Sequence, residues 1–268
     1  MQYRGNRLSL WLRLCVAAAL FGCTTAVSSY RDIPNFERRV SGIKSIVTLP
    51  TRARVYQLDA GGIKEEVPEW SQQATRRLAA AVQQEFHQRH QTALKLLSEE
   101  DLTEAEKSIL NQTRALLDAV ETSIFIHTYG PPGYRFPDKV LDFDYSLGKE
   151  VRTLGRGEAD ALLVIQGVDH QWTEGRKALQ ALGVIVGLGA GVATGMVVIP
   201  ILGGGTMIKA ALVDAQTGTL LWYNIAAARG GHDLRDPNSA VALTRELFKD
   251  YPLARTRSEI PEIGGPEK

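Results

Sequence analysis

Two histidines on a predicted helix are the first candidates for chemistry. His87 and His90 are three residues apart in EFHQRH, a spacing that can direct two imidazoles to one metal ion. Neither an HExxH motif nor a cysteine pair accompanies them, and the neighbouring Gln and Arg residues are typical of a solvated helix face. We therefore expect no metal site at this pair.

A second candidate cation site is the acidic pair in DFD, Asp142 and Asp144. Two carboxylates can bind a cation, but an aspartate directly before a helical stretch commonly caps the helix through its side chain. The sequence favours the second role, with Asp144 capping a helix that begins at Tyr145.

Two further histidines could serve a hydrolase. His170 ends an apolar run of strand length, and His232 lies in the polar loop RGGHDLRD, residues 229–236. No G-x-S-x-G motif and no Walker A lysine accompanies them, so the nucleophile or phosphate loop of those chemistries is missing. We predict no catalytic, cofactor-binding or metal-binding residue, and we regard loop 229–236 as a possible partner contact, because loops often carry such contacts.

The glycines do not form a dinucleotide-binding motif. Gly187, Gly189 and Gly191 give G-x-G-x-G, but the final glycine or alanine of the motif falls on Val192 or Thr194. The acidic residue expected about 20 residues later, within a βαβ unit, is also missing. The glycines therefore need another explanation.

The glycine-rich segment repeats glycine at every fourth position, at Gly183, Gly187, Gly191 and Gly195, within a charge-free run over residues 178–208. As a helix, residues 178–199 would span about 33 Å, enough to cross the hydrocarbon core of a bilayer. The glycines would then form a groove that lets another helix approach closely, whereas on a free helix in water each costs about 0.5–1 kcal/mol relative to alanine.

Three structures of this segment are compatible with the pattern. The first is a helix that inserts into a membrane or self-associates. The second is a helix buried within the fold or against a partner. The third is a pair of membrane strands, although the alternation of polar and apolar residues that such strands need is missing. We predict the first, with the four spaced glycines as the membrane or self-association element.

The amino terminus has the composition of an export signal. The chain has 268 residues, 44% hydrophobic and 23% charged, with a net charge of +1. Residues 1–22 hold three arginines and no acid, and they end in the short apolar run LCVAAALFG, which is too short to span a membrane. Without these residues acidic side chains slightly outnumber basic ones, so the chain lacks the basic surface of a nucleic-acid-binding protein.

The signal ends in LFGC, residues 20–23, which resembles a bacterial lipobox. The resemblance implies cleavage before Cys23 and attachment of diacylglycerol and an acyl chain to that residue. Thr24, rather than Asp, at the next position implies the outer membrane, with the protein on the periplasmic face. A conventional signal with an incidental cysteine is the alternative. Cys15 leaves with the signal, so Cys23 would be the lone cysteine and no intramolecular disulfide is possible.

The remaining chain predicts one α/β domain. We expect a polar tether over residues 23–42, a domain over 43–252 and a disordered tail over 253–268. Strands are predicted in KSIVTLP and ARVYQL, a helix over 68–86, a strand in TALKLL, and a helix that opens with a capping box of Thr103 and Glu106.

The second half of the domain contains a shorter helix around residues 147–154, a central strand in ADALLVIQGV, a hairpin that turns at Gly218, and a terminal helix that ends before Pro252. The predicted fold is therefore α/β: a mixed sheet with interleaved helices and a carboxy-terminal hairpin and helix. The apolar glycine-rich stretch, 178–208, is an insertion in this domain.

Two motifs resemble the CsgG-type and TolB-amino-terminal-like envelope lipoproteins: GEADALLVIQGVD, and further on IKAALVDAQTGTLLWYN. The residues that match the hairpin of this group are Leu212, Val213, Asp214, Thr217, Gly218, Leu221 and Trp222. The resemblance implies a secretion-channel subunit, an activator of a cell-wall synthase or another accessory protein, none of them catalytic through this fold. The glycine-rich stretch departs from the group, because a short connection is expected there.

The sequence thus predicts a non-catalytic outer-membrane lipoprotein that serves as an accessory subunit in export or surface assembly. It would associate with the membrane and with further copies or another envelope protein, without nucleic acid and without a cofactor other than the lipid on Cys23. The alternative is a monomeric lipoprotein that docks on and activates a periplasmic enzyme such as a cell-wall synthase.

Overall fold

The computed structural model describes residues 27–89, 93–130, 132–175, 205–228 and 231–251. The predicted signal peptide, Cys23, His90, the four spaced glycines and the carboxy-terminal tail lie outside these residues. What the sequence predicts for them therefore stays a prediction.

The described residues form an eight-stranded mixed sheet, as the sequence predicts. The main strand order is β1-β8-β7-β6-β2-β5, with β3 beside β6 and β4 beside β3. Pairing is parallel for β2 with β5 and for β6 with β2 and β3, and antiparallel for the other pairs. The strands are β1 (Val27–Asp32), β2 (Ser45–Thr48), β3 (Arg52–Leu58), β4 (Lys64–Glu66), β5 (Ala93–Leu96), β6 (Ala161–Trp172), β7 (Gly205–Asp214) and β8 (Leu220–Ala228).

The predicted central strand is β6, which pairs with β7 on one side and with β2 and then β3 on the other. Its first five residues, 161–165, are buried, as expected of a strand covered on both faces. Pro50 separates β2 from β3, and both run parallel to β6, so the two strands predicted at the start of the domain are confirmed.

The predicted hairpin is β7 and β8. Gly218 has a φ of 75° in its turn, a conformation that L side chains rarely adopt. The Asp214 carboxylate accepts hydrogen bonds from the backbone N–H groups of Gln216 and Thr217 at 3.0 and 2.8 Å, which closes the turn locally.

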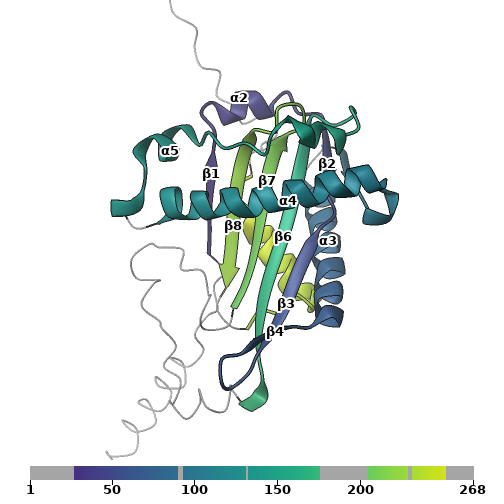
Figure 1. Cartoon of the computed structure of the whole chain (residues 1–268), viewed down its shortest axis with the longest axis vertical. Coiled ribbons are helices and arrows are strands. Elements are labelled where there is room, and N and C mark those ends of the chain that lie inside the picture. Colours follow the sequence, from purple (N-terminus) through teal and green to yellow (C-terminus); the bar gives the residue numbers. More distant parts are fainter. Residues whose placement is uncertain (1–26, 90–92, 131, 176–204, 229–230, 252–268) are drawn as a thin grey trace, which may run out of the picture.

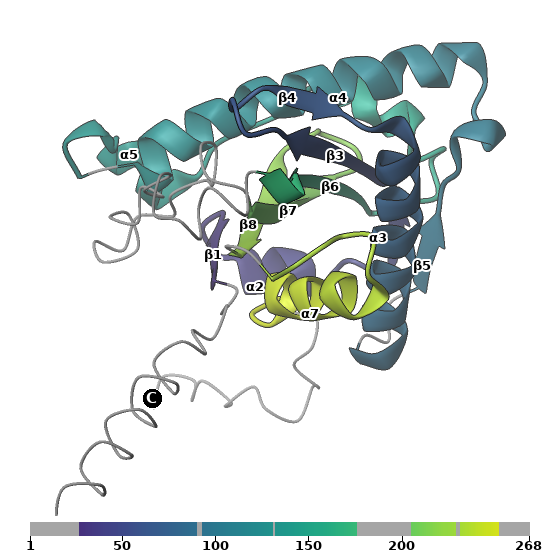
Figure 2. The same cartoon turned by 90° about the horizontal axis from the view of Figure 1, so that it is seen from below.

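Helices cover both faces of the sheet (Figures 1 and 2). On one face lie α3 (Pro68–Arg89) and α7 (Pro237–Phe248), and on the other lies α4 (Glu104–Ile124). The predicted capping box is present at the start of α4: the Glu106 amide donates to the Thr103 hydroxyl, and the Thr103 amide donates to the Glu106 carboxylate at 2.8 Å. The predicted helices over 68–86 and from Glu104 are confirmed.

Shorter helical elements complete the domain: α2 (Phe36–Val40), η1 (Glu99–Asp101), η2 (Phe125–Tyr129), η3 (Pro132–Tyr134), α5 (Pro137–Asp142) and η4 (Lys149–Thr153). The helix predicted around residues 147–154 is the 3-10 element η4. None of the described helices is both long and apolar enough to cross a membrane.

The predicted tether over residues 23–42 is wrong from Val27 onward. Residues 27–32 form β1, which pairs with β8 at the edge of the sheet. After it, Ile33, Phe36 and Val40 are buried in the core. Residues 27–32 show no clear hydrophobic period in the sequence. They are held in the sheet by backbone hydrogen bonds to a distant strand, and such bonds leave no pattern of side-chain types from which a strand could be predicted.

The end of the predicted apolar insertion also belongs to the sheet. Residues 205–208, the last four of the charge-free run, are the first four residues of β7. The described domain therefore takes up the chain again at Gly205, directly beside His170 of β6.

Candidate functional site

One end of the sheet, which we call the anchor end, gathers several chain exits. The register aligns Val27 of β1 with Ala227 of β8, Ala227 with Met207 of β7, and Met207 with Val168 of β6. The start of β1, four residues after Cys23, therefore lies in a row near the end of β6 and near the start of β7. In Figure 1 this is the lower end of the sheet.

The glycine-rich segment is the connection between two neighbouring strands of this sheet. β6 and β7 are antiparallel, and His170 pairs with Gly205. Residues 176–204 follow the end of β6 and precede the start of β7. Both ends of this segment therefore lie at the anchor end: Gly205 is beside His170, and residue 175, after which the segment begins, is five residues further along the chain.

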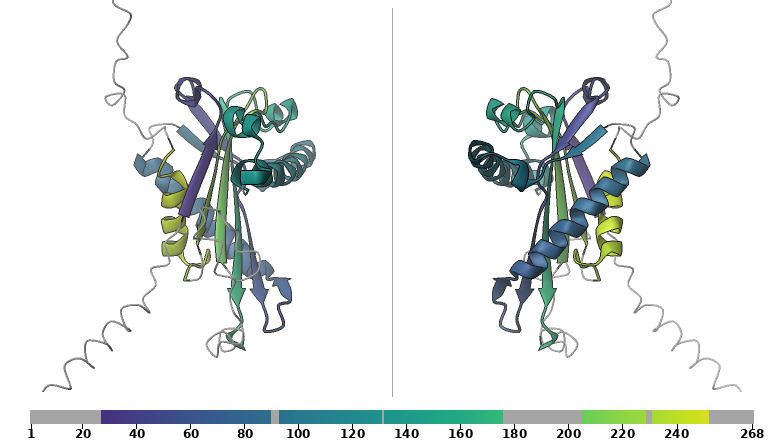
Figure 3. Two further views of the ribbon diagram at one scale, coloured as in Figure 1. Left: turned by 90° about the vertical axis from the view of Figure 1, so that its left-hand side faces the viewer. Right: turned by 90° about the vertical axis from the view of Figure 1, so that its right-hand side faces the viewer.

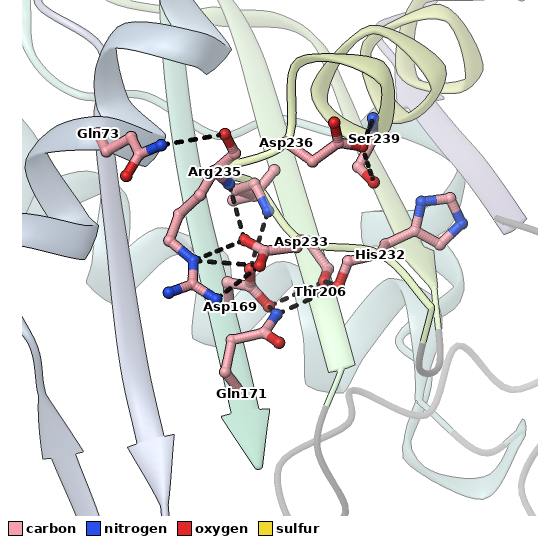
Figure 4. A network of polar contacts seen from close by, with 10 residues as sticks. Gln73, Asp169, Gln171, Thr206, His232, Asp233, Arg235, Asp236 and Ser239 are labelled. Carbon is pink, nitrogen blue, oxygen red and sulfur yellow. Dashed lines mark hydrogen bonds and ion pairs between the residues drawn. The ribbon is translucent and has the colours of Figure 1, made fainter. Parts of the chain in front are cut away.

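A buried carboxylate lies where the two strands meet at this end (Figure 4). Asp169 of β6 is fully buried. One of its oxygens accepts from the Thr206 hydroxyl of β7 at 2.9 Å and from the Gln171 amide at 2.8 Å, and the other accepts from the Leu234 backbone N–H at 2.9 Å. Three donors from three segments thus share one carboxylate, and we call this group the Asp169 clamp.

The clamp also holds the loop that precedes α7. The carbonyl oxygen of His232 accepts from the Gln171 amide at 3.2 Å, and it lies 3.0 Å from the Thr206 hydroxyl, whose single proton it shares with Asp169. Leu234 is fully buried over Gly167, where an added Cβ would come within 2.9 Å of the leucine side chain. Glycine at position 167 therefore makes room for Leu234, and the clamp then fixes its backbone.

The charged residues of the same loop are paired locally. Arg235 contacts Asp233 at 2.6 Å and lies over the ring of Trp70 of α3, 4.0 Å from its centroid. The Asp236 carboxylate accepts from the backbone N–H of Ser239 at 3.0 Å and caps α7. The described part of loop 229–236 is thus fastened to the domain by its own side chains.

Asp169 and His170 do not form a catalytic pair. Adjacent residues of a strand point to opposite faces of the sheet: Asp169 faces the loop before α7, whereas His170 stacks on Tyr56 of β3 with ring centroids 5.5 Å apart. Burial raises the pKa of Asp169 to about 6, against the opposing effect of its hydrogen bonds. Burial, with a smaller contribution from Lys64, lowers the pKa of His170 to about 4, so the ring is neutral at pH 7.

The other residues that the sequence offers for metal binding do not gather into a site in the described part of the chain. His87 is exposed on α3. Within the described ranges, no three His, Cys, Asp or Glu side chains lie close enough together to hold a metal ion.

The predicted cap at Asp144 is wrong. Its carboxylate pairs with Lys139 at 2.6 Å, and Ser146 forms a β-bridge with Thr219 instead of entering a helix. The carbonyl of Tyr145 accepts from the Leu220 amide at 2.9 Å. These bonds to the hairpin favour an extended backbone over the predicted helical turn.

Part of the clamp has a signal in the sequence. Gly167, Asp169 and Gln171 alternate in IQGVDHQ at the end of an apolar run, so a period of two places them on one face of a strand. A glycine and two polar residues on a face that should be buried indicate that something polar packs there. The partners Thr206 and Leu234 are too distant in sequence to be predicted in this way.

The chain shows only a weak structural likeness to known proteins. No protein family matches the chain, and no curated protein matches it. Among solved structures, the PelC dodecamer from Paraburkholderia phytofirmans is similar with a TM-score of 0.36 and 9% identity, over 87% of this chain and 100% of that one. A single-substitution variant of that PelC dodecamer gives 0.34 and 9%, over 86% and 99%. Likeness at this level assigns neither a family nor a function.

Proposed function

We propose that this chain is a non-catalytic lipoprotein of the outer membrane, attached through Cys23, which acts as an accessory subunit in export or surface assembly. In this proposal the glycine-rich segment joins copies of the chain to one another at the membrane. The four glycines at positions 183, 187, 191 and 195 form the contact surface.

The observation that carries the proposal is the shared exit at the anchor end. Only a few residues separate Cys23 from Val27, and an extended chain covers at most about 14 Å over that stretch. A lipid on Cys23 would therefore hold the anchor end close to the membrane surface. Both ends of the charge-free, glycine-rich segment leave the sheet at that same end, where the segment can reach the bilayer or the segments of neighbouring copies.

The Asp169 clamp suits this arrangement. It ties Thr206 at the start of β7 to the end of β6 through a fully buried carboxylate. If the glycine-rich segment binds neighbouring copies, those contacts pull on β6 and β7, the two strands that it connects. The hydrogen bonds of the clamp resist the separation of these strands. The clamp thus supports the proposal, because it holds together the two strands from which the segment extends.

The hydrolase alternative finds no support in this geometry. Both oxygens of Asp169 are engaged by structural donors, and His170 faces the opposite side of the sheet, stacked on Tyr56. The resemblance of the hairpin to the CsgG-type and TolB-amino-terminal-like lipoproteins also favours a role in binding and assembly over catalysis.

The first test is extraction of membranes with alkaline carbonate. A Cys23→Ser protein exported through a conventional signal peptide lacks the lipid, so any retention in the membrane must come from the chain itself. Retention is expected if the glycine-rich segment inserts. A folded protein that washes off entirely would instead favour contact of this segment with protein.

The second test addresses assembly. Replacing Gly187 and Gly191 by leucine fills the predicted groove, and chemical crosslinking in intact cells should then lose its multimers. The matched control places leucine at Gly189 and Ala193, which have the same four-residue spacing but lie on the other side of a helix. Loss with the first pair alone supports the proposal, whereas a protein that is monomeric before any substitution supports the activator alternative.

A further inference from the structure

The turn between β3 and β4 carries an unusually exposed hydrophobic residue. Ile63 is 70% exposed at the tip of this hairpin. The turn is closed by its own hydrogen bonds: the Ile63 amide donates to the Asp59 carboxylate at 2.8 Å, and the Asp59 amide donates to the Ile63 carbonyl at 3.1 Å. Gly62 has a φ of 87° within it. The exposed isoleucine is thus presented by a closed turn.

This tip belongs to the anchor end. β3 runs parallel to β6, and the register aligns Lys64 of β4 with Leu58 of β3 and Leu58 with Trp172, the last residue of β6. The turn of residues 59–63 therefore extends past the end of β6, where the chain enters the glycine-rich segment. Figure 3 shows the hairpin and the end of β6 projecting together beyond the helices.

The residues behind the tip are of the types found at the boundary between a membrane and water. The Lys64 ammonium lies 3.7 Å from the ring centroid of Tyr56, and half-buried Trp172 lies in the next row of the same sheet face. Tryptophan and tyrosine are enriched at this boundary, and lysine side chains extend along apolar surface with the charge in water.

We propose that the β3–β4 tip inserts Ile63 into the headgroup–acyl boundary of the membrane to which Cys23 is anchored. The proposal rests on the proposed function for one point, namely that lipid on Cys23 holds the anchor end at the bilayer. The tip then supplies a second contact, separate from the chain exits, which fixes how the domain stands on the membrane.

The charges of the hairpin specify what kind of lipid contact this is. Asp59, Glu65 and Glu66 outnumber Lys64 over residues 59–66, so the tip has no net attraction to anionic headgroups. The contact is apolar, formed by burial of the Ile63 side chain, and it does not depend on anionic lipid or on ionic strength.

The molecule provides a matched reference point. Leu141 of α5 is 71% exposed, almost the same as Ile63. It lies near the opposite end of the sheet, since α5 leads to Tyr145, whose carbonyl accepts from the amide of Leu220 at the start of β8. An exposed hydrophobic side chain at that end should remain in water when the protein stands on a membrane.

The test uses the full lipidated protein in vesicles of phosphatidylcholine and phosphatidylethanolamine. An environment-sensitive fluorophore is attached to a cysteine introduced by Ala60→Cys at the tip or by Leu141→Cys at the reference point. Lipids with spin labels on their acyl chains quench only probes that enter the bilayer. We expect strong quenching at position 60, unchanged by salt, and little quenching at position 141.

The isoleucine itself is tested in the same protein. Adding Ile63→Ser to the Ala60→Cys protein should lower the population of inserted tips about tenfold, because burial of one aliphatic side chain is lost. Equal, weak quenching at positions 60 and 141 would overturn the inference. A blue-shifted but unquenched probe at position 60 would also overturn it, since the tip would then be buried against protein.

The labelling step separates this inference from the proposed function. An acylated Cys23 has no free thiol, so the protein without an introduced cysteine should take up no label. If it takes up one label per chain, lipidation has failed and the proposed function with it. The tip can then still be examined in a Cys23→Ser protein held on vesicles by an amino-terminal polyhistidine tag and a nickel-chelating lipid.

Discussion

The two faces of the sheet are covered in different ways. On the α3 and α7 face, the helices and the segment after them meet the sheet through aromatic rings: Trp222 lies 5.8 Å from Phe248 and 4.9 Å from Tyr251, centroid to centroid, and Phe86 of α3 lies 5.2 Å from Phe248. On the α4 face, buried leucines are accompanied by two buried charged residues, Arg114 and Glu121.

Each charge on α4 has a partner elsewhere in the domain. Glu121 pairs with Lys209 of β7, and Arg114 contacts Glu99 at 2.6 Å and the carbonyl of Pro50 at 2.9 Å.

Burial of large aromatic side chains gains free energy roughly in proportion to the apolar area that is removed from water. Ion pairs fix a position but recover little of the cost of removing charge from water. The α3 and α7 face also buries Asp169, and α3 itself buries Glu85. We infer that the ring cluster makes this aromatic face the larger source of stability, and that the ion pairs of the other face set where α4 lies.

The largest expected effect is on the aromatic face. Trp222→Ala removes a fully buried side chain from the centre of the ring cluster and should lower the free energy of unfolding by about 3–5 kcal/mol. Chemical denaturation measures this directly. Leu116→Ala, at a position of α4 that is 47% exposed, is the control and should change stability by less than about 0.5 kcal/mol. Similar losses in both variants would contradict the inferred contrast.

A somewhat smaller loss is expected when the ion pair under α4 is broken on one side. Lys209→Met leaves the Glu121 carboxylate buried without its cation, and burial already raises the pKa of Glu121. We expect a loss of about 3 kcal/mol.

The double variant Lys209→Met with Glu121→Leu tests whether the pair stabilises or only positions α4. It should regain most of the stability lost in Lys209→Met, because no charge is then buried. A double variant as unstable as the single one would show that the pair itself stabilises this face, and the comparison of the faces would need revision.

The next prediction concerns Asp169, a buried carboxylate on the aromatic face. Its pKa is about 6 in the folded protein and 3.8 in an ordinary setting, so between these values the folded state binds the proton and the unfolded state does not. Stability from this group is therefore fully present below about pH 4 and is lost as the pH rises through 6, by up to about 3 kcal/mol.

The matched variant is Asp169→Asn, which keeps the shape and does not titrate. The free energy of unfolding of the unchanged protein, minus that of the variant, should fall between about pH 4 and pH 7 in urea titrations. A difference that stays flat or rises over this range would show that the hydrogen bonds from Thr206, Gln171 and Leu234 outweigh the cost of burying the charge.

Much of this fold could be predicted because its signals are local. The central strand is a continuous apolar run, and the hairpin turn is encoded within five residues, Asp214 to Gly218. The box of Thr103 and Glu106 marks the start of α4. In each case the residues that carry the signal are neighbours in sequence, even where, as for the central strand, the pairing partners are distant.

The features that escaped prediction depend on distant partners. β1 takes its backbone bonds from β8, about 200 residues away, and Ser146 joins Thr219 instead of following Asp144 into a helix. The Asp169 clamp joins three segments that come together only in the folded sheet. The β6 part of this clamp can be predicted from the alternation of Gly167, Asp169 and Gln171 in the sequence. A period of two shows that these residues share a face, but it does not identify the residues that pack against that face.

The smallest expected effect returns to α4 and the way it is held in position. Thr103→Ala removes the side-chain cap at its first turn and should lower the free energy of unfolding by about 1 kcal/mol, whereas Thr103→Ser keeps the hydroxyl and should restore most of it. Because Glu106 of the same box also contacts Arg156 at 2.9 Å, the start of the helix has a second attachment. If α4 is positioned by such polar contacts, hydrogen exchange in Thr103→Ala should rise in the first turns of α4 and stay unchanged in α3 and α7. Faster exchange in all three helices would mean that the two faces unfold as one unit.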